Sequence, residues 1–94
     1  MGIKRYAAHR LRIGNRILLS PYIELQSGTS LHVALFEEEL ERTIFLSGTI
    51  VLHHPNYVVD RDIEDDACAQ ISLENLLMEI TPILSAMDVE LPSL

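Results

Sequence analysis

The first half of the chain alternates between apolar and polar side chains over short stretches. In residues 6–13, Arg10 and Arg12 alternate with Leu11 and Ile13, a period of two that is typical of a half-buried strand. Further apolar stretches, several of them rich in β-branched or aromatic residues, follow at 17–19, 22–26, 31–36, 43–46 and 49–52. The pattern predicts four to six strands within the first 54 residues.

Residues that favour turns separate these stretches. Turns are predicted at Gly14-Asn15, 27–30 and Ser47-Gly48. Pro21 cannot donate to a ladder, so it indicates an edge position, a bulge or a break between two short strands. Residues 37–42 predict a hairpin connection or a short helical turn. Connections this short favour an antiparallel meander or a small barrel, because parallel pairing usually needs crossovers of about a dozen residues or more.

The last third of the chain changes to a helical period. Ser72 is a suitable N-cap, and Glu74 lies in the first turn, where a carboxylate complements the helix dipole. Steps of three and four then connect one apolar stripe, formed by Leu73, Leu76, Leu77, Ile80, Ile83, Leu84 and Met87. Pro82 removes a backbone hydrogen bond and should kink or split this helix. The pattern predicts an amphipathic helix over 72–88 and a frayed tail over 89–94.

These elements fit one small domain. A chain of 94 residues can bury one core but is too short for two ordinary domains, and its 48% hydrophobic content is typical of a globular protein. We therefore expect an α+β, mainly β fold: a small antiparallel sheet or half-sandwich of four to six strands, followed by one C-terminal helix. The β-rich part covers residues 1–54, and an acidic connecting loop covers 55–71.

The charged residues are segregated along the chain. Residues 1–23 contain five of the seven Lys and Arg residues and no acid, although the net charge is −7. This basic segment can pair with the acidic runs within one chain or between copies, or each run can simply be a solvated face. The acidic residues in question are Glu37, Glu38, Glu39, Glu41, Asp60, Asp62, Glu64, Asp65 and Asp66.

Charge and hydropathy also argue against several classes of partner. A nucleic-acid binder is usually basic with aromatics among its basic residues, whereas this chain has a pI of about 4.9 and five aromatic residues. No run of 18 apolar residues indicates a membrane span. Basic residues occupy the N-terminal region where a secretory signal needs an apolar stretch. We therefore expect a cytoplasmic protein without nucleic-acid or membrane partners.

Few side chains suggest chemistry. The adjacent pair His53-His54, with Asp60 downstream, is the one cluster that suggests a metal site. Neighbouring residues of a strand point to opposite faces, so both histidines can bind one ion only where the strand ends, as at Pro55. Histidines at such an exit are more often solvated or bonded to the backbone, and the single Cys68 predicts a small buried residue. Without a phosphate-binding loop or a nucleophile motif, we expect no metal, no cofactor and no enzyme.

The apolar helix stripe has two interpretations. As a core element, it would cover one face of the small sheet, which would otherwise expose its apolar side to water. As an interface element, it would pair with a second copy or a larger partner through Leu76, Ile80, Ile83 and Met87. The two roles are compatible if the stripe is wide enough.

The first 54 residues also resemble a known family. Residues 6–9, the strands near Leu11, Ile23 and Val33, and the segment 45–54 follow an order similar to the N-terminal β-domain of the amidohydrolase superfamily. The resemblance implies part of a small β-sandwich, and in that family the last segment leads into a metal-bearing barrel. Here Ser47 stands where proline is usual, Val51 stands where aspartate is expected, and the histidines are adjacent instead of spaced by one. The barrel of roughly 200 residues or more is absent from this sequence.

Three functional hypotheses follow. The first is a stand-alone relative of that accessory β-domain, acting as a non-catalytic binding or assembly module; its exposed sheet edges favour self-association, with a homodimer expected. The second is a metal-dependent hydrolase subunit in which His53, His54 and Asp60 hold an ion, completed by another chain. The third is a small regulatory protein that docks on an enzyme through its C-terminal helix.

Overall fold

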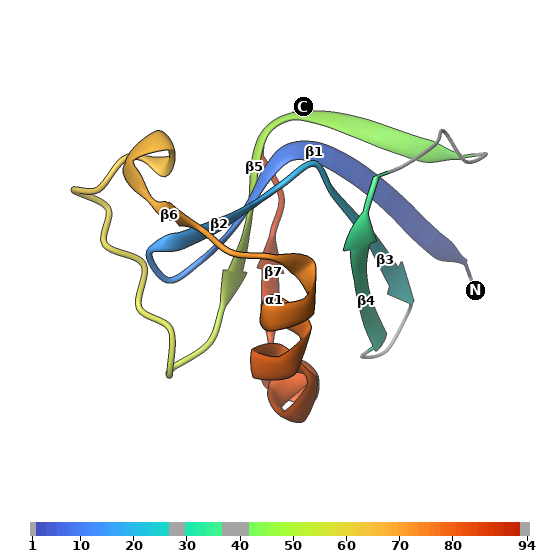
Figure 1. Ribbon diagram of the computed structural model, residues 1–94. Coiled ribbons are helices and arrows are strands. Elements are labelled where there is room, and N and C mark those ends of the chain that lie inside the picture. Colours follow the sequence, from blue (N-terminus) through green and yellow to red (C-terminus); the bar gives the residue numbers. More distant parts are fainter. Residues whose placement is uncertain (1, 27–29, 37–41, 93–94) are drawn as a thin grey trace.

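The computed structural model describes residues 2–26, 30–36 and 42–92 and shows a curled sheet with one helical segment against it (Figure 1). The α+β, mainly β class is confirmed. The strands are β1 Ile3–Ile13, β2 Arg16–Leu19, β3 Pro21–Gln26, β4 Ser30–Leu35, β5 Thr43–His53, β6 Ala69–Gln70 and β7 Asp88–Glu90. The helices are η1 Asp65–Ala67, α1 Leu73–Ile80 and η2 Thr81–Ala86, of which η1 and η2 are 3₁₀ helices.

Strand β1 is the centre of the sheet. One edge of β1 pairs antiparallel with β3 in its first half and with β2 in its second half, and the other edge pairs with β5. β4 extends the sheet beyond β3, while β6 pairs with β2 and β7 pairs with the end of β5. Because β1 and β5 both bend along their length, the sheet curls around the helical segment (Figure 1).

The sheet is rich in antiparallel pairs but mixed, because β5 runs parallel to β1 and β6 runs parallel to β2. An antiparallel meander contains no such pairs. Strands β4 and β5 lie at opposite edges of the four-stranded part β4-β3-β1-β5. The predicted connection at 37–42 lies outside the described residues except for Arg42.

Strand β5 is one bent strand, although the sequence predicts two stretches divided by Ser47-Gly48. The register moves from Ala8↔Leu46 to Arg10↔Thr49, so that Ser47 and Gly48 together oppose His9. This is a β-bulge, which inserts one extra residue and increases the local bend without ending the pairing. Gly48 has φ 119°, a conformation that other residues rarely adopt.

The helical segment follows the sequence prediction at its start and at Pro82. Ser72 Oγ accepts a hydrogen bond from the Asn75 amide at 3.2 Å, which confirms the N-cap. The α-helical turns end at Ile80, and a 3₁₀ helix with Pro82 in its first turn continues to Ala86. The chain beyond it differs from the expected frayed tail, because the end of β5 offers an edge with which residues 88–90 pair as β7.

The core lies between the inner face of the curled sheet and the helical segment. Its fully buried members include Leu11, Ile13, Ile23, Leu46, Ile50, Leu52, Leu76 and Ile80. The two-residue turn Gly14-Asn15 connects β1 to β2, and Gly14 has φ 57°, a positive value at the first turn position as in type II′ hairpins. No helix in the described part of the chain is both long and apolar enough to cross a membrane.

Candidate functional site

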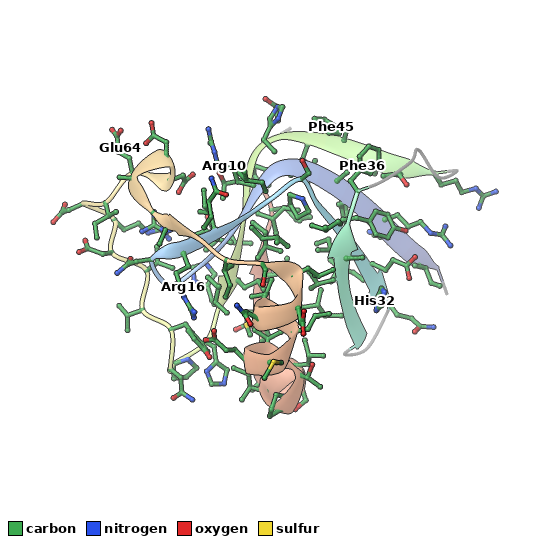
Figure 2. All side chains as sticks on the ribbon, in the orientation of Figure 1. Arg10, Arg16, His32, Phe36, Phe45 and Glu64 are labelled. Atoms are coloured by element: carbon green, nitrogen blue, oxygen red, sulfur yellow. The ribbon has the colours of Figure 1, made fainter. Side chains whose placement is uncertain are left out.

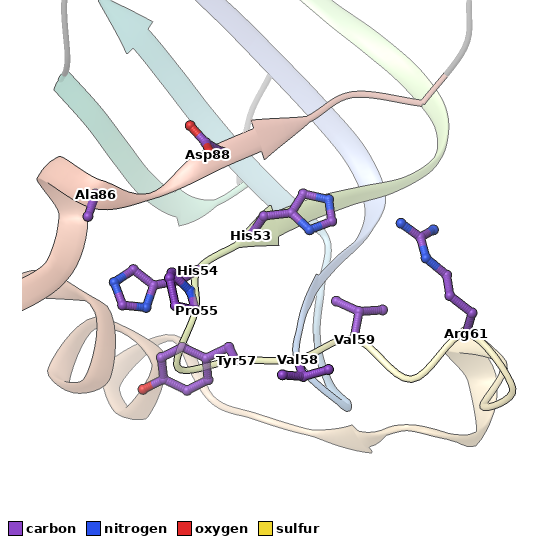
Figure 3. A pocket seen from close by; sticks show the side chains of 9 residues that line it. All are labelled: His53, His54, Pro55, Tyr57, Val58, Val59, Arg61, Ala86 and Asp88. Carbon is purple, nitrogen blue, oxygen red and sulfur yellow. The ribbon is translucent and has the colours of Figure 1, made fainter.

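The residues of the predicted metal site are not brought together. His53 Nε2 lies 2.6 Å from Glu90 Oε1, whereas His54 Nδ1 accepts a hydrogen bond from the Asn56 amide at 3.0 Å. The two imidazoles extend to opposite sides of the chain (Figure 3). Asp60 Oδ1 accepts from the amide of Asp62 at 2.9 Å. Residues 2–26, 30–36 and 42–92 contain no group of three or more His, Cys, Asp or Glu side chains that could hold a metal ion.

The two histidines do border a shallow pocket of about 350 Å³ (Figure 3). Its other polar lining residues are Tyr57, Arg61 and Asp88. Glu90, the partner of His53, has a lowered pKa because it accepts a hydrogen bond from His53 and lies near Arg61, whose Nη2 is 3.6 Å from Glu90 Oε1. The pocket is open to solvent, and Arg61, one of its charged lining residues, faces the carboxylate of Glu90.

The predicted interface residues of the helix lie mostly in the core. Leu76 and Ile80 have 0% exposure, so in this fold they cannot contact a partner. Ile83 and Met87 are partly buried and pack against the same core. The stripe therefore covers the sheet, as its core interpretation requires. Met78, on the opposite side of α1, is the large apolar side chain that this helix exposes, at 72%.

Arg12 joins the sheet to the acidic loop. Its side chain points to the outer face of the sheet, yet it is only 4% exposed because residues 60–65 pass over it. Its nitrogens donate to the carbonyl oxygens of Gly14, Asp60 and Ile63, to Asn15 Oδ1, and to Asp65 Oδ1 at 3.0 Å. Asp65 also accepts from Thr49 Oγ1 at 2.6 Å, and this bond, followed by Arg12, lowers the pKa of Asp65.

A second ion pair fixes the helix to the hairpin. Arg16 Nη1 donates to Glu79 Oε2 at 2.6 Å, and the Tyr57 hydroxyl donates to Glu79 Oε1 at 3.1 Å. The bond from Arg16 is the main reason that the pKa of Glu79 is lowered, and burial is the main reason that the pKa of Tyr57 is raised. The basic N-terminal segment therefore pairs with acids of its own chain. Arg12 pairs with Asp65, Arg16 with Glu79, and Arg5 with Glu24.

Part of β5 has no strand beside it on one edge, within the chain that the structure describes. On that side β7 pairs with residues 51–53, and Pro92 follows with its ring close to Gly48. A Cβ atom placed on Gly48 would lie 3.3 Å from the Pro92 Cβ. The pairing of β7 ends at Glu90, and Pro92 has no amide hydrogen with which to resume it. At the other end, Arg42 has φ 61°, which is outside the range of extended strand backbone. We call residues 43–47 the open edge.

The open edge exposes apolar side chains on both faces of the sheet. Ile44 is 45% exposed and Phe45 is 55% exposed, and adjacent residues of a strand point to opposite faces. The Phe45 ring makes edge contacts with His9 at 5.2 Å and with Phe36 at 6.4 Å between centroids. Figure 2 shows Phe36 and Phe45 beside each other on the side of the sheet away from α1. The segment contains no charged residue, although charged residues are the usual protection of an exposed strand.

The sequence predicts exposed edges in general but does not locate this one. The available signal is the uncharged run of residues 43–47 beside the turn-forming Ser47-Gly48. Arg12 was identified only as part of an alternating strand, and its partners lie 48 or more residues away in three of its bonds.

Comparisons with known proteins give no support for a family assignment: no family model, no curated protein and no solved structure matches the chain. The resemblance to the amidohydrolase β-domain therefore remains a prediction from sequence.

Proposed function

We propose that this protein is a non-catalytic assembly module that associates with a second copy of itself by strand pairing at the open edge. The observation that carries the proposal is the eleven-residue strand β5, whose second edge is paired at 51–53 and has no strand beside 43–47 among the described residues. Unpaired amide and carbonyl groups along such an edge are a template for another strand. The exposed Ile44 and Phe45 side chains beside them supply apolar surface to bury.

The open edge is where a second copy meets the least electrostatic repulsion. With a net charge of −7, two copies repel each other over most of their surface, but the open edge has no charged residue. An antiparallel pairing of the same segment is isologous, so it closes as a dimer and uses the open edge of both copies. Burial of the exposed parts of Ile44 and Phe45 contributes about 1 kcal/mol each, in addition to the new backbone hydrogen bonds.

The amidohydrolase resemblance is compatible with this proposal. In that family the resembling strands belong to a sandwich that other parts of the protein complete, and here the second copy would supply the additional strands. The shallow pocket beside His53 and His54 plays no part in this role.

Native mass spectrometry combined with light scattering at about 50 μM tests the proposal. We expect a metal-free dimer for the natural sequence, and at least a tenfold weaker dimer for Phe45→Lys. Val58→Lys and Met78→Lys are matched controls, because both residues are more exposed than Phe45 and lie away from the open edge. Both controls should remain dimeric.

Other outcomes have definite meanings. A monomer for the natural sequence overturns the assembly module. If Met78→Lys dissociates the dimer, the interface lies on the exposed side of α1 and not at the open edge. A stoichiometric divalent ion that is lost in the double variant His53→Ala, His54→Ala supports the hydrolase hypothesis instead.

A further inference from the structure

We infer that the two copies pair antiparallel about a two-fold axis through Phe45, so that Thr43 of one copy lies opposite Ser47 of the other. This inference rests on the proposed self-association and adds the register of the contact. The four-stranded parts β4-β3-β1-β5 of both copies then form one continuous sheet.

The length of the open edge limits the register. Arg42, with φ 61°, ends the extended backbone on one side, and Pro92 occupies the edge beside Gly48 on the other. Residues 43–47 are therefore the longest segment that can pair, and Phe45 is its central residue. Pairing about Phe45 uses the whole segment in both copies, because every residue of 43–47 then lies opposite a residue of the same segment in the other copy.

The neighbouring registers are less favourable. An axis through Leu46 places Thr43 opposite Thr49 of the other copy, beyond the point where Pro92 covers the edge. An axis through Ile44 places the charged Arg42 opposite the buried Leu46. Registers that place the axis between two residues, for example between Ile44 and Phe45, are excluded. They would set side chains from different faces opposite each other, whereas opposing side chains in an antiparallel pair lie on the same face of the sheet.

The side chains of the segment are complementary in this register. Hydroxyl residues face each other at Thr43 and Ser47, aliphatic residues face each other at Ile44 and Leu46, and Phe45 faces its own copy. Cross-strand pairs of these kinds stabilise antiparallel sheets. The segment is thus complementary to a second copy of itself.

Disulfide trapping tests the register. The buried native thiol is removed by Cys68→Ala, and Thr43→Cys and Ser47→Cys are introduced separately into that background. Directly opposite residues have Cα atoms about 4.5–5.5 Å apart, which suits a disulfide. We expect each single variant to remain uncrosslinked under mild oxidation, whereas an equimolar mixture of the two converts most of the mixed dimer to a covalent one. Ile44→Cys is a control that should not crosslink with itself. In this register, residue 44 of one copy lies opposite Leu46 of the other, two positions away from that copy's residue 44.

The outcomes separate the register from the proposed function. If all variants are dimeric in native mass spectrometry but the mixture does not crosslink, the register is overturned and self-association stands. If Ile44→Cys crosslinks with itself, the axis passes through Ile44 and the inference is likewise overturned. If the natural chain is a monomer, both the register and the proposed function fail.

Discussion

The buried Arg12 side chain is the residue on which the acidic loop depends. Arg12→Met removes all its hydrogen bonds and leaves the carbonyl oxygens of Gly14, Asp60 and Ile63 without that donor. We expect a loss of roughly 2–4 kcal/mol in the free energy of unfolding, measured in urea, because unpaired buried acceptors are costly. Arg12→Lys should not restore it, since a lysine cannot reproduce the guanidinium fork. Arg61→Met, at a side chain that is 69% exposed, should change stability by less than about 0.5 kcal/mol.

Asp65 makes part of this stability dependent on pH. Its pKa in the folded protein is lowered by the hydrogen bond from Thr49 and by Arg12. A carboxyl whose folded pKa lies below its unfolded pKa stabilises the fold above the unfolded value of about 3.9, and this contribution disappears as the pH falls through the folded pKa. The difference in unfolding free energy between the natural protein and Asp65→Asn should therefore be full at pH 7 and shrink below about pH 4.

The comparison with Asp65→Asn isolates one carboxyl from the others whose pKa is lowered, namely Glu24, Glu79 and Glu90. Asp66→Asn, at an exposed neighbour, is the control for the removal of one negative charge from this part of the chain. A difference for Asp65→Asn that stays constant from pH 7 to pH 2 would contradict the assigned role of its charge.

At the scale of elements, the bulge of β5 depends on Gly48. Alanine at this position would require φ 119° and would bring its Cβ to 3.3 Å from the Pro92 Cβ. We expect Gly48→Ala to lower the free energy of unfolding by about 1–3 kcal/mol, measured in urea. Hydrogen exchange should also become faster at the amides of β7, because Pro92, which follows β7, packs close to Gly48 of β5. Gly2→Ala is the control, because a Cβ there meets nothing within 4 Å.

The elements differ in how far the sequence determines them. The helix was predictable because its cap, its apolar steps and its proline are all local signals, and Ser72 and Pro82 act where expected. The bulge was not predictable, because a glycine after a serine is equally compatible with a turn and with a bulge. What decides between them is β1 on the other side, which continues unbroken past His9. β7 was missed for a similar reason: three residues acquire strand structure only from the edge of β5.

At the scale of the molecule, the class of fold could be predicted and the topology could not. Alternation in the first 54 residues establishes a sheet, but it does not indicate that β5 pairs parallel with β1. The candidate site illustrates the same limit. Residues 43–47 are visible in the sequence as an uncharged strand, but only the positions of β7 and Pro92 show that one edge has no strand beside it among the described residues.

A protein that completes its sheet with a second copy should have a stability that depends on its own concentration. Dimer formation stabilises the folded state by mass action, so raising the concentration from about 5 to 500 μM should raise the thermal midpoint. For a chain of this size, roughly 1 kcal/mol per protomer corresponds to a shift of about 4–8 °C. Phe45→Lys should abolish the shift while keeping the midpoint of the dilute natural protein, because Phe45 is already 55% exposed in one copy. A midpoint that is independent of concentration in the natural protein would show that the open edge stays unpaired over this range.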